Sequence, residues 1–162
     1  MCITANGYIA KEDDNTNWIS GEEWDSYSKM IRRAGCMVVG HRTYDILTKQ
    51  PEFSELSAVK VVIVSNNKVT IISENHVIAN NPASAINLLK DFDEVIIAGG
   101  GKLNSSFVVE GLVDEMYLDI EPLVFGKGIQ LFSPADFENK LELIETNKLS
   151  KNTLQLHYKV LK

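Results

Sequence analysis

Two glycine-rich segments contain the residues best suited to binding an anion. Gly40-His41-Arg42-Thr43 follows the apolar run 37–39, and Gly99-Gly100-Gly101-Lys102 follows the apolar run 95–98. Each pattern predicts a strand that ends in glycine directly before a helix. The free N–H groups and the dipole of a helix start attract anions, and glycine lets a phosphate approach the backbone. Both segments are candidate phosphate sites. The alternative is that each is only a tight turn between a strand and a helix, which requires glycine even without a ligand.

Arg42 and Thr43 favour the binding interpretation, because a guanidinium and a hydroxyl are good phosphate donors. Neither glycine segment has the spacing G-x-G-x-x-G of a Rossmann site or the G-K-[ST] of a P-loop. Kinase and ATPase chemistry are therefore disfavoured.

A third polar segment, Ser65-Asn66-Asn67-Lys68, follows the β-branched run 59–64. Its hydroxyl, amides and ammonium could hold the adenosine end of a dinucleotide, with Lys68 and Arg42 neutralising a 2′-phosphate. A plain polar turn is the alternative. Ligands of open α/β sheets bind at the carboxyl ends of the strands, and all three polar segments follow such ends.

Composition narrows the class of protein. The chain has 162 residues, 44% of them hydrophobic, and a net charge of -6. This charge argues against a nucleic-acid binder, because phosphate backbones select for clustered Lys and Arg. No apolar run approaches the roughly 20 residues of a membrane span, and no signal peptide is visible. Cys2 and Cys36 are expected to be buried free thiols of a cytoplasmic protein. The three histidines lie far apart, so no metal site is expected.

The elements that position these segments follow from the hydrophobic pattern. Strands are predicted at 59–64, 94–98 and 116–120, and helices at 43–49, 82–91 and 102–110. The end of the chain differs, because 141–145 and 153–160 alternate apolar and polar residues as antiparallel strands do. One α/β domain over residues 1–162 is expected, with parallel units first and an antiparallel hairpin last.

The order and spacing of the motifs resemble the dihydrofolate reductase superfamily. Within it, the chain is most similar to the reductase (C-terminal) domain of the bifunctional riboflavin-biosynthesis deaminase/reductase, over nearly its whole length. The motifs that carry the resemblance are Asn6–Ala10, Trp18, Val39–Tyr44, Val62–Ser65, Ile96–Gly101, Glu110–Pro122 and Phe125–Gly128.

The resemblance implies a three-layer dihydrofolate-reductase-like fold, with a mixed, mostly parallel sheet flanked by helices and a C-terminal antiparallel hairpin. It also implies NADPH as the hydride donor. By position, Ile9 and Ala10 would lie near the nicotinamide, and Ser65 and Asn66, with Arg42, would hold the adenosine phosphate. The residues that would clasp the pyrophosphate are Gly40, His41, Arg42, Thr43, Gly99, Gly100, Gly101, Lys102 and Leu103.

Two carboxylates are candidates for the acid. Dihydrofolate reductases carry an acid on the first helix shortly beyond a tryptophan, which here are Glu23 and Trp18. Ser20 and Glu23 also fit a capping box, so Glu23 could be structural instead. Asp119 lies where those enzymes place a hydroxyl residue facing the acid. If it lies near Glu23, like-charge repulsion would raise the pKa of Glu23 and make it a proton source; otherwise Asp119 faces solvent.

The resemblance implies a cofactor-dependent reductase that reduces a C=N bond of a pteridine or aminopyrimidine. Dihydrofolate and the ribosylaminopyrimidine intermediate of riboflavin biosynthesis are the two candidate substrates. Asn6, Trp18 and Glu23 are assigned to the substrate site. Two departures, Asn6 where relatives usually have Asp and Ala98 where riboflavin reductases often have an acid, keep a non-catalytic NADP(H)-binding module as the alternative. A homodimer is expected, through an edge of the C-terminal hairpin.

Overall fold

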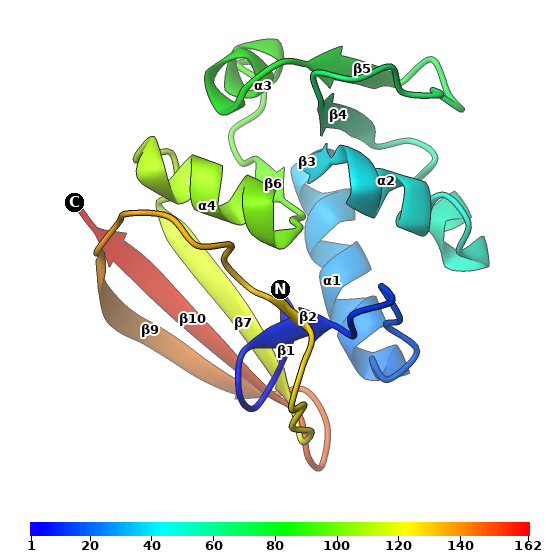
Figure 1. Ribbon diagram of the computed structural model, residues 1–162. Helices are drawn as coiled ribbons and strands as arrows, with labels where there is room; N and C mark the ends of the chain where they lie inside the picture. Colours follow the sequence, from blue (N-terminus) through cyan, green and yellow to red (C-terminus); the bar gives the residue numbers. More distant parts are fainter.

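The strands form two four-stranded sheets and one two-stranded ribbon in the computed structural model, which describes residues 1–162 (Figure 1). In chain order the elements are β1 (Cys2–Thr4), β2 (Tyr8–Ala10), α1 (Gly21–Ala34), β3 (Cys36–Gly40), α2 (His41–Leu47), η1 (Pro51–Leu56), β4 (Lys60–Val64), β5 (His76–Ala79), α3 (Pro82–Leu88), β6 (Ile96–Ile97), α4 (Gly101–Val109), β7 (Glu115–Glu121), β8 (Ile129–Gln130), β9 (Lys140–Lys148) and β10 (Leu154–Leu161).

The first sheet is entirely parallel and has the order β5-β4-β3-β6. Residues 37–39 of β3 and 61–63 of β4 are completely buried, as strands covered on both faces should be. This sheet confirms the predicted parallel units. It also brings the carboxyl ends of β3, β4 and β6 to one edge, where the three polar segments follow.

The second sheet has the order β1-β7-β10-β9 and is mixed. β1 runs parallel to β7, whereas β10 is antiparallel to both β7 and β9. The predicted hairpin is therefore confirmed, and it lies at the outer side of the molecule with the C-terminus at its end (Figure 1). The parallel and antiparallel parts of the predicted sheet are separate sheets here.

Helix α1 connects the two sheets. Ser20 caps its start by accepting a hydrogen bond from the N–H of Glu23, and Gly35 ends it with a φ of 72°. The helix packs against β3, while its Ser26 lies 3.3 Å from Gln155 on β10 of the other sheet. No helix in the structure combines the length and the apolar character that crossing a bilayer requires.

Several element boundaries differ from the predictions. α2 begins at His41 instead of residue 43, so His41 and Arg42 lie in its first turn. The strand expected at 94–98 is reduced to Ile96–Ile97, because it pairs with β3 on one side only. The short strand His76–Ala79 was not predicted, since its neighbours Asn75 and Asn80 interrupt the apolar pattern.

Candidate functional site

The two glycine segments form one site, because β3 and β6 are neighbours in the parallel sheet. The N–H of Gly40 donates a hydrogen bond of 2.8 Å to the carbonyl oxygen of Gly99. A Cβ on Gly100 would lie 3.0 Å from Oγ1 of Thr43. Gly99 has a φ of 86°, a left-handed conformation that favours glycine. The starts of α2 and α4 therefore lie side by side.

Both helix starts lack a side-chain cap. Gly40 is the N-cap of α2 and Gly100 is the N-cap of α4, and neither helix has a side chain that accepts from its first N–H groups. By contrast, Ser20 caps α1 and Asn81 caps α3. Free N–H groups at a helix start are satisfied by a side chain, by water or by a ligand. Among the four α-helices, only α2 and α4 have uncapped starts, and these two starts converge on the glycine site.

The side-chain positions of Gly101, Lys102 and Leu103 do not face the glycine site in the way that Gly100 does. A Cβ on Gly101 would lie 2.5 Å from the carbonyl oxygen of Gln130, so backbone packing alone requires glycine there. The side chain of Leu103 belongs to a buried apolar cluster with Phe107, and that of Lys102 is exposed. Leu103 can therefore contact a ligand only through its backbone.

Ile9 lies beside the glycine site, whereas Ala10 is buried next to Gly128. The Cδ1 atom of Ile9 is 3.7 Å from the position of a Cβ on Gly100. Ala10 is buried, and its carbonyl oxygen would be 2.5 Å from a Cβ on Gly128. The structure thus brings the predicted nicotinamide contact at Ile9 next to the predicted pyrophosphate contact at Gly100.

The third polar segment adjoins the first one. Ser65 follows β4, and its hydroxyl lies 3.2 Å from Nδ1 of His41 at the start of α2. The same hydroxyl accepts a hydrogen bond from the N–H of Asn67, so Ser65 organises the turn. Asn66 and Lys68 are exposed at this edge.

Arg42 is already paired with an acid. Its Nε lies 2.8 Å and its Nη2 lies 2.6 Å from Oδ2 of Asp14. Asp14 belongs to the loop between β2 and α1 and has a φ of 66°. The predicted phosphate ligand therefore has a competing anion, which the sequence pattern did not indicate.

Three carboxylates are buried together between α1 and β7. Glu23 is 3%, Asp119 is 2% and Glu121 is 4% exposed. Oδ1 of Asp119 accepts a hydrogen bond of 2.8 Å from Nε2 of Gln155 on β10. Of the two alternatives for Asp119, exposure to solvent is wrong, because α1 and β10 enclose the side chain.

Glu121 replaces half of the capping box predicted for α1. Ser20 accepts from the N–H of Glu23, as that motif requires. The N–H and hydroxyl of Ser20, however, both donate to Oε1 of Glu121, and Thr153 donates to its other oxygen. The side chain of Glu23 is therefore not the capping partner. Glu121 and Gln155 were missed because their roles depend on which strands are neighbours.

The burial of these carboxylates changes their chemistry. The pKa of Glu23 is raised from 4.5 to about 7, chiefly by burial and also by the nearby Asp119 and Glu121, while the amino group of Met1 opposes the increase. Burial also raises the pKa of Cys2 and of Tyr27, with Glu23 adding to both shifts. The Cys2 thiol is therefore unsuited to nucleophilic catalysis, and Glu23 is the group that can exchange a proton near neutral pH.

Asn6 and Trp18 both contact the loop that carries Phe125. Nδ2 of Asn6 donates to the carbonyl oxygen of Phe125 (2.7 Å), and the N–H of Phe125 donates to Oδ1 of Asn6 (3.1 Å). The Trp18 ring packs edge-on against the Phe125 ring with centroids 5.4 Å apart. Both ends of the Asn6 amide thus bond to the backbone of Phe125. An aspartate at this position could not donate to the carbonyl oxygen of Phe125.

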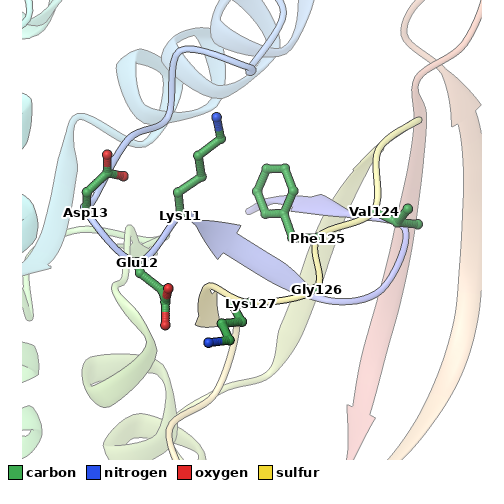
Figure 2. A pocket seen from close by; sticks show the side chains of 7 residues that line it. All are labelled: Lys11, Glu12, Asp13, Val124, Phe125, Gly126 and Lys127. Carbon is green, nitrogen blue, oxygen red and sulfur yellow. The ribbon is translucent and has the colours of Figure 1, made fainter.

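A surface pocket of about 500 Å³ opens at this loop (Figure 2). It is lined by Lys11, Glu12, Asp13, Val124, Phe125, Gly126 and Lys127. The ammonium of Lys11 lies 6.0 Å from the centroid of the Phe125 ring, and the two side chains extend next to each other in Figure 2. The sequence offered Phe125 only as part of the motif Phe125–Gly128.

Similar proteins place this geometry in a known family. Residues 1–155 match the family model described as the RibD C-terminal domain. An uncharacterized protein of Bacillus subtilis (strain 168), YwjB, is 29% identical over 168 residues, which cover 98% of this chain and 94% of that protein.

Solved structures have the same fold. A putative riboflavin biosynthesis protein from Shewanella sp. PV-4 superposes with a TM-score of 0.80 at 21% identity, over 100% of this chain and 97% of that one. A deaminase/5-amino-6-(5-phosphoribosylamino)uracil reductase from Thermotoga maritima gives a TM-score of 0.72 at 17% identity, over 99% of this chain and 55% of that one. These likenesses confirm the predicted α/β reductase fold, and the family match shows that this chain belongs to the RibD C-terminal (reductase) domain family.

Proposed function

We propose that this protein is an NADPH-dependent reductase that transfers a hydride to a C=N bond of a pteridine or aminopyrimidine ring. The observation that carries the proposal is the pair of uncapped helix starts at Gly40 and Gly100, joined by the hydrogen bond from Gly40 to Gly99. Two sets of free N–H groups on one small surface suit a pyrophosphate. Reductases of this family use NADPH, which supports the choice of ligand.

The residues around this surface fit the cofactor. Thr43 and the N–H groups after Gly40 and Gly100 would bind the pyrophosphate, while Arg42, Ser65 and Asn66 would hold the adenosine phosphate. Ile9 would pack against the nicotinamide, since it lies beside Gly100. When bound, NADPH would supply the hydride, and the protein would supply orientation and the proton.

The buried carboxylates are the proposed source of the proton. Glu23 has a pKa of about 7, so near neutral pH a large fraction of it carries a proton. Burial is the main cause of that high pKa and Asp119 adds to it, while Gln155 fixes the orientation of Asp119. Because Glu23 is only 3% exposed, a substrate ring must lie against the carboxylates to receive its proton.

A non-catalytic NADP(H)-binding module is the second candidate. The observations that favour it are the enclosure of Glu23 and Asp119 and the use of the Asn6 amide by the Phe125 backbone. Such a module would bind NADPH at the glycine site but would not present an acid to a substrate.

Turnover distinguishes the two candidates. Loss of NADPH absorbance is followed with dihydrofolate and with the ribosylaminopyrimidine as substrates. The reductase proposal predicts turnover with one of them and its loss in Glu23→Gln. Glu22→Gln is the matched control, because Glu22 is the preceding residue of the same helix but is exposed. NADPH binding with no turnover on either ring would favour the binding module.

A further inference from the structure

His41 and Ser65 form a polar pair at the carboxyl edge of the parallel sheet. Gly40 of β3 lies opposite Val64 of β4, so His41 and Ser65 are the next residues along two neighbouring strands. Oγ of Ser65 lies 3.2 Å from Nδ1 of His41. The imidazole ring therefore faces the third polar segment, 65–68, where the adenosine phosphate of the cofactor is proposed to bind.

Both ring nitrogens of His41 face oxygen atoms. The Ser65 hydroxyl donates to the carbonyl oxygen of Asn67 (3.1 Å), so its oxygen is the acceptor toward Nδ1. On the other side of the ring, Nε2 lies 3.5 Å from Oδ2 of Asp45, one turn further along α2. A neutral imidazole has one N–H donor, whereas an imidazolium has two. The protonated ring therefore matches its surroundings at both nitrogens.

The His41 ring is also accessible to a ligand. Its side chain is 29% exposed, and the cationic Lys68 is exposed at the same edge. Arg42, by contrast, is directed to Asp14 in the loop between β2 and α1. A phosphate beside Ser65 would thus meet the imidazole of His41, while the guanidinium of Arg42 must first leave its carboxylate partner.

We propose that His41 is a specificity-determining residue, whose imidazolium binds the 2′-phosphate that distinguishes NADPH from NADH. The imidazolium would attract the phosphate by its charge and donate to it from Nδ1, which here donates to Ser65. This role differs from the pyrophosphate contact that the resemblance implies for His41. The inference rests on the proposed NADPH site.

The proposal makes the preference for NADPH depend on pH. Imidazole groups gain or lose their charge between about pH 5 and 8, whereas guanidinium and ammonium groups keep theirs over this range. Arg42 and Lys68 would therefore contribute a constant part of the preference, and His41 a part that grows as the pH falls. Asp45 remains beside Nε2 in either case and supports the charged ring.

The direction of the pH dependence separates His41 from the ligand itself. A phosphate monoester takes up its second proton near pH 6 and then attracts a cation less strongly. The ligand alone would therefore bind more weakly as the pH falls from 8.5 to 6.5. The imidazolium would instead make the binding stronger over the same range.

The experiment uses adenosine 2′,5′-bisphosphate and adenosine 5′-phosphate as ligands of the full chain. They differ only by the 2′-phosphate, and both lack the nicotinamide that would lie near the titrating Glu23. Isothermal titration gives the ratio of their affinities at pH 6.5 and at pH 8.5. In the parent protein, we expect the preference for the bisphosphate to be about tenfold greater at pH 6.5.

Two substitutions at position 41 test the assignment. His41→Gln should lower the preference at pH 6.5 to its value at pH 8.5, because the glutamine amide carries no charge. His41→Arg should retain the larger preference at both pH values. His157→Gln is the matched control, because this histidine lies on β10 in the other sheet, and its preference should vary with pH as in the parent protein.

A direct readout is the imidazole C–H resonance of His41, followed by NMR at pH 7.5. The bisphosphate should move this resonance toward its position at low pH, and adenosine 5′-phosphate should move it much less. A preference that does not change with pH, or that changes equally in His41→Gln, would overturn the inference and leave the NADPH site in place. If neither nucleotide nor NADPH binds, the NADPH site and the inference both fail.

Discussion

The N–H of Gly40 lies 2.8 Å from the carbonyl oxygen of Gly99 and donates a hydrogen bond to it. Through this bond, two glycine turns that are far apart in the sequence become one surface with two uncapped helix starts.

Gly100→Ala should weaken NADPH binding about tenfold, which corresponds to roughly 1.4 kcal/mol. The added methyl group would stand 3.0 Å from Oγ1 of Thr43 and would obstruct the backbone that a phosphate must approach. Isothermal titration measures the affinity. Gly21→Ala is the control, because nothing lies within 4 Å of its Cβ position. The same affinity in both variants would exclude Gly100 from the binding surface.

Gly101→Ala should reduce stability. Its methyl group would meet the carbonyl oxygen of Gln130 at 2.5 Å, and such overpacking costs about 1–3 kcal/mol. Urea unfolding without any ligand measures the effect. A free energy of unfolding equal to that of the parent protein would show that Gly101 is not required for packing.

Arg42→Ala should weaken NADPH binding much more than NADH binding, if Arg42 contacts the 2′-phosphate. Asp14→Asn should have the opposite effect on NADPH, because it frees Arg42 from its ion pair. Exposed pairs contribute about 0–1 kcal/mol, so the gain should be no more than about fivefold. Equal losses for both cofactors in Arg42→Ala would instead indicate a pyrophosphate or structural role.

The pKa of Glu23 predicts how stability depends on pH. Its pKa is raised from 4.5 to about 7 in the folded protein, so between these values the unfolded chain releases a proton that the folded protein keeps. The contribution of Glu23 to the free energy of unfolding should therefore be greatest below pH 4.5, and it should fall as the pH rises to 7. The loss should reach up to about 3 kcal/mol above pH 7.

Glu23→Gln removes this dependence. Urea unfolding at pH 5 and pH 8 should show a smaller difference in the Gln variant than in the parent protein, whereas Glu22→Gln should leave the difference unchanged. An unaltered difference in Glu23→Gln would mean that the Glu23 carboxyl is not held in its protonated form by the fold.

Gln155→Leu should destabilise the protein by about 1–3 kcal/mol, because it leaves a buried oxygen of Asp119 without its donor. The same change at the exposed Gln50 is the matched control. If Asp119 also supports the proton source, Gln155→Leu should shift the pH profile of turnover, which a purely structural role would not do. Unchanged stability and an unchanged profile would contradict both roles.

Local patterns predicted the elements that depend on neighbours in the chain. The buried run at β4, the Pro82 start of α3 and the alternation in β9 and β10 each have a local cause, and each is present. The glycine segments were also identified individually. Their meeting required β3 and β6 to be neighbours, which depends on the packing of the whole sheet.

The site details that escaped prediction depend on contacts between distant residues. Glu121 takes the place of Glu23 at the Ser20 cap because β7 passes the start of α1. Asp14 reaches Arg42 because the loop before α1 folds over α2. Asn6 was predicted to contact substrate, but its partner in the structure is the backbone of Phe125, 119 positions along the chain.

The contacts of Asn6 also bear on the chemical lifetime of the protein. An Asn followed by Gly is the sequence most prone to deamidation, in which the following backbone nitrogen attacks the side-chain amide carbon. Here the amide is held at both ends by Phe125, and the N–H of Gly7 donates to the carbonyl oxygen of Thr4 at 3.0 Å. Both reacting groups are restrained, so Asn6 should deamidate far more slowly in the folded protein than in the unfolded chain.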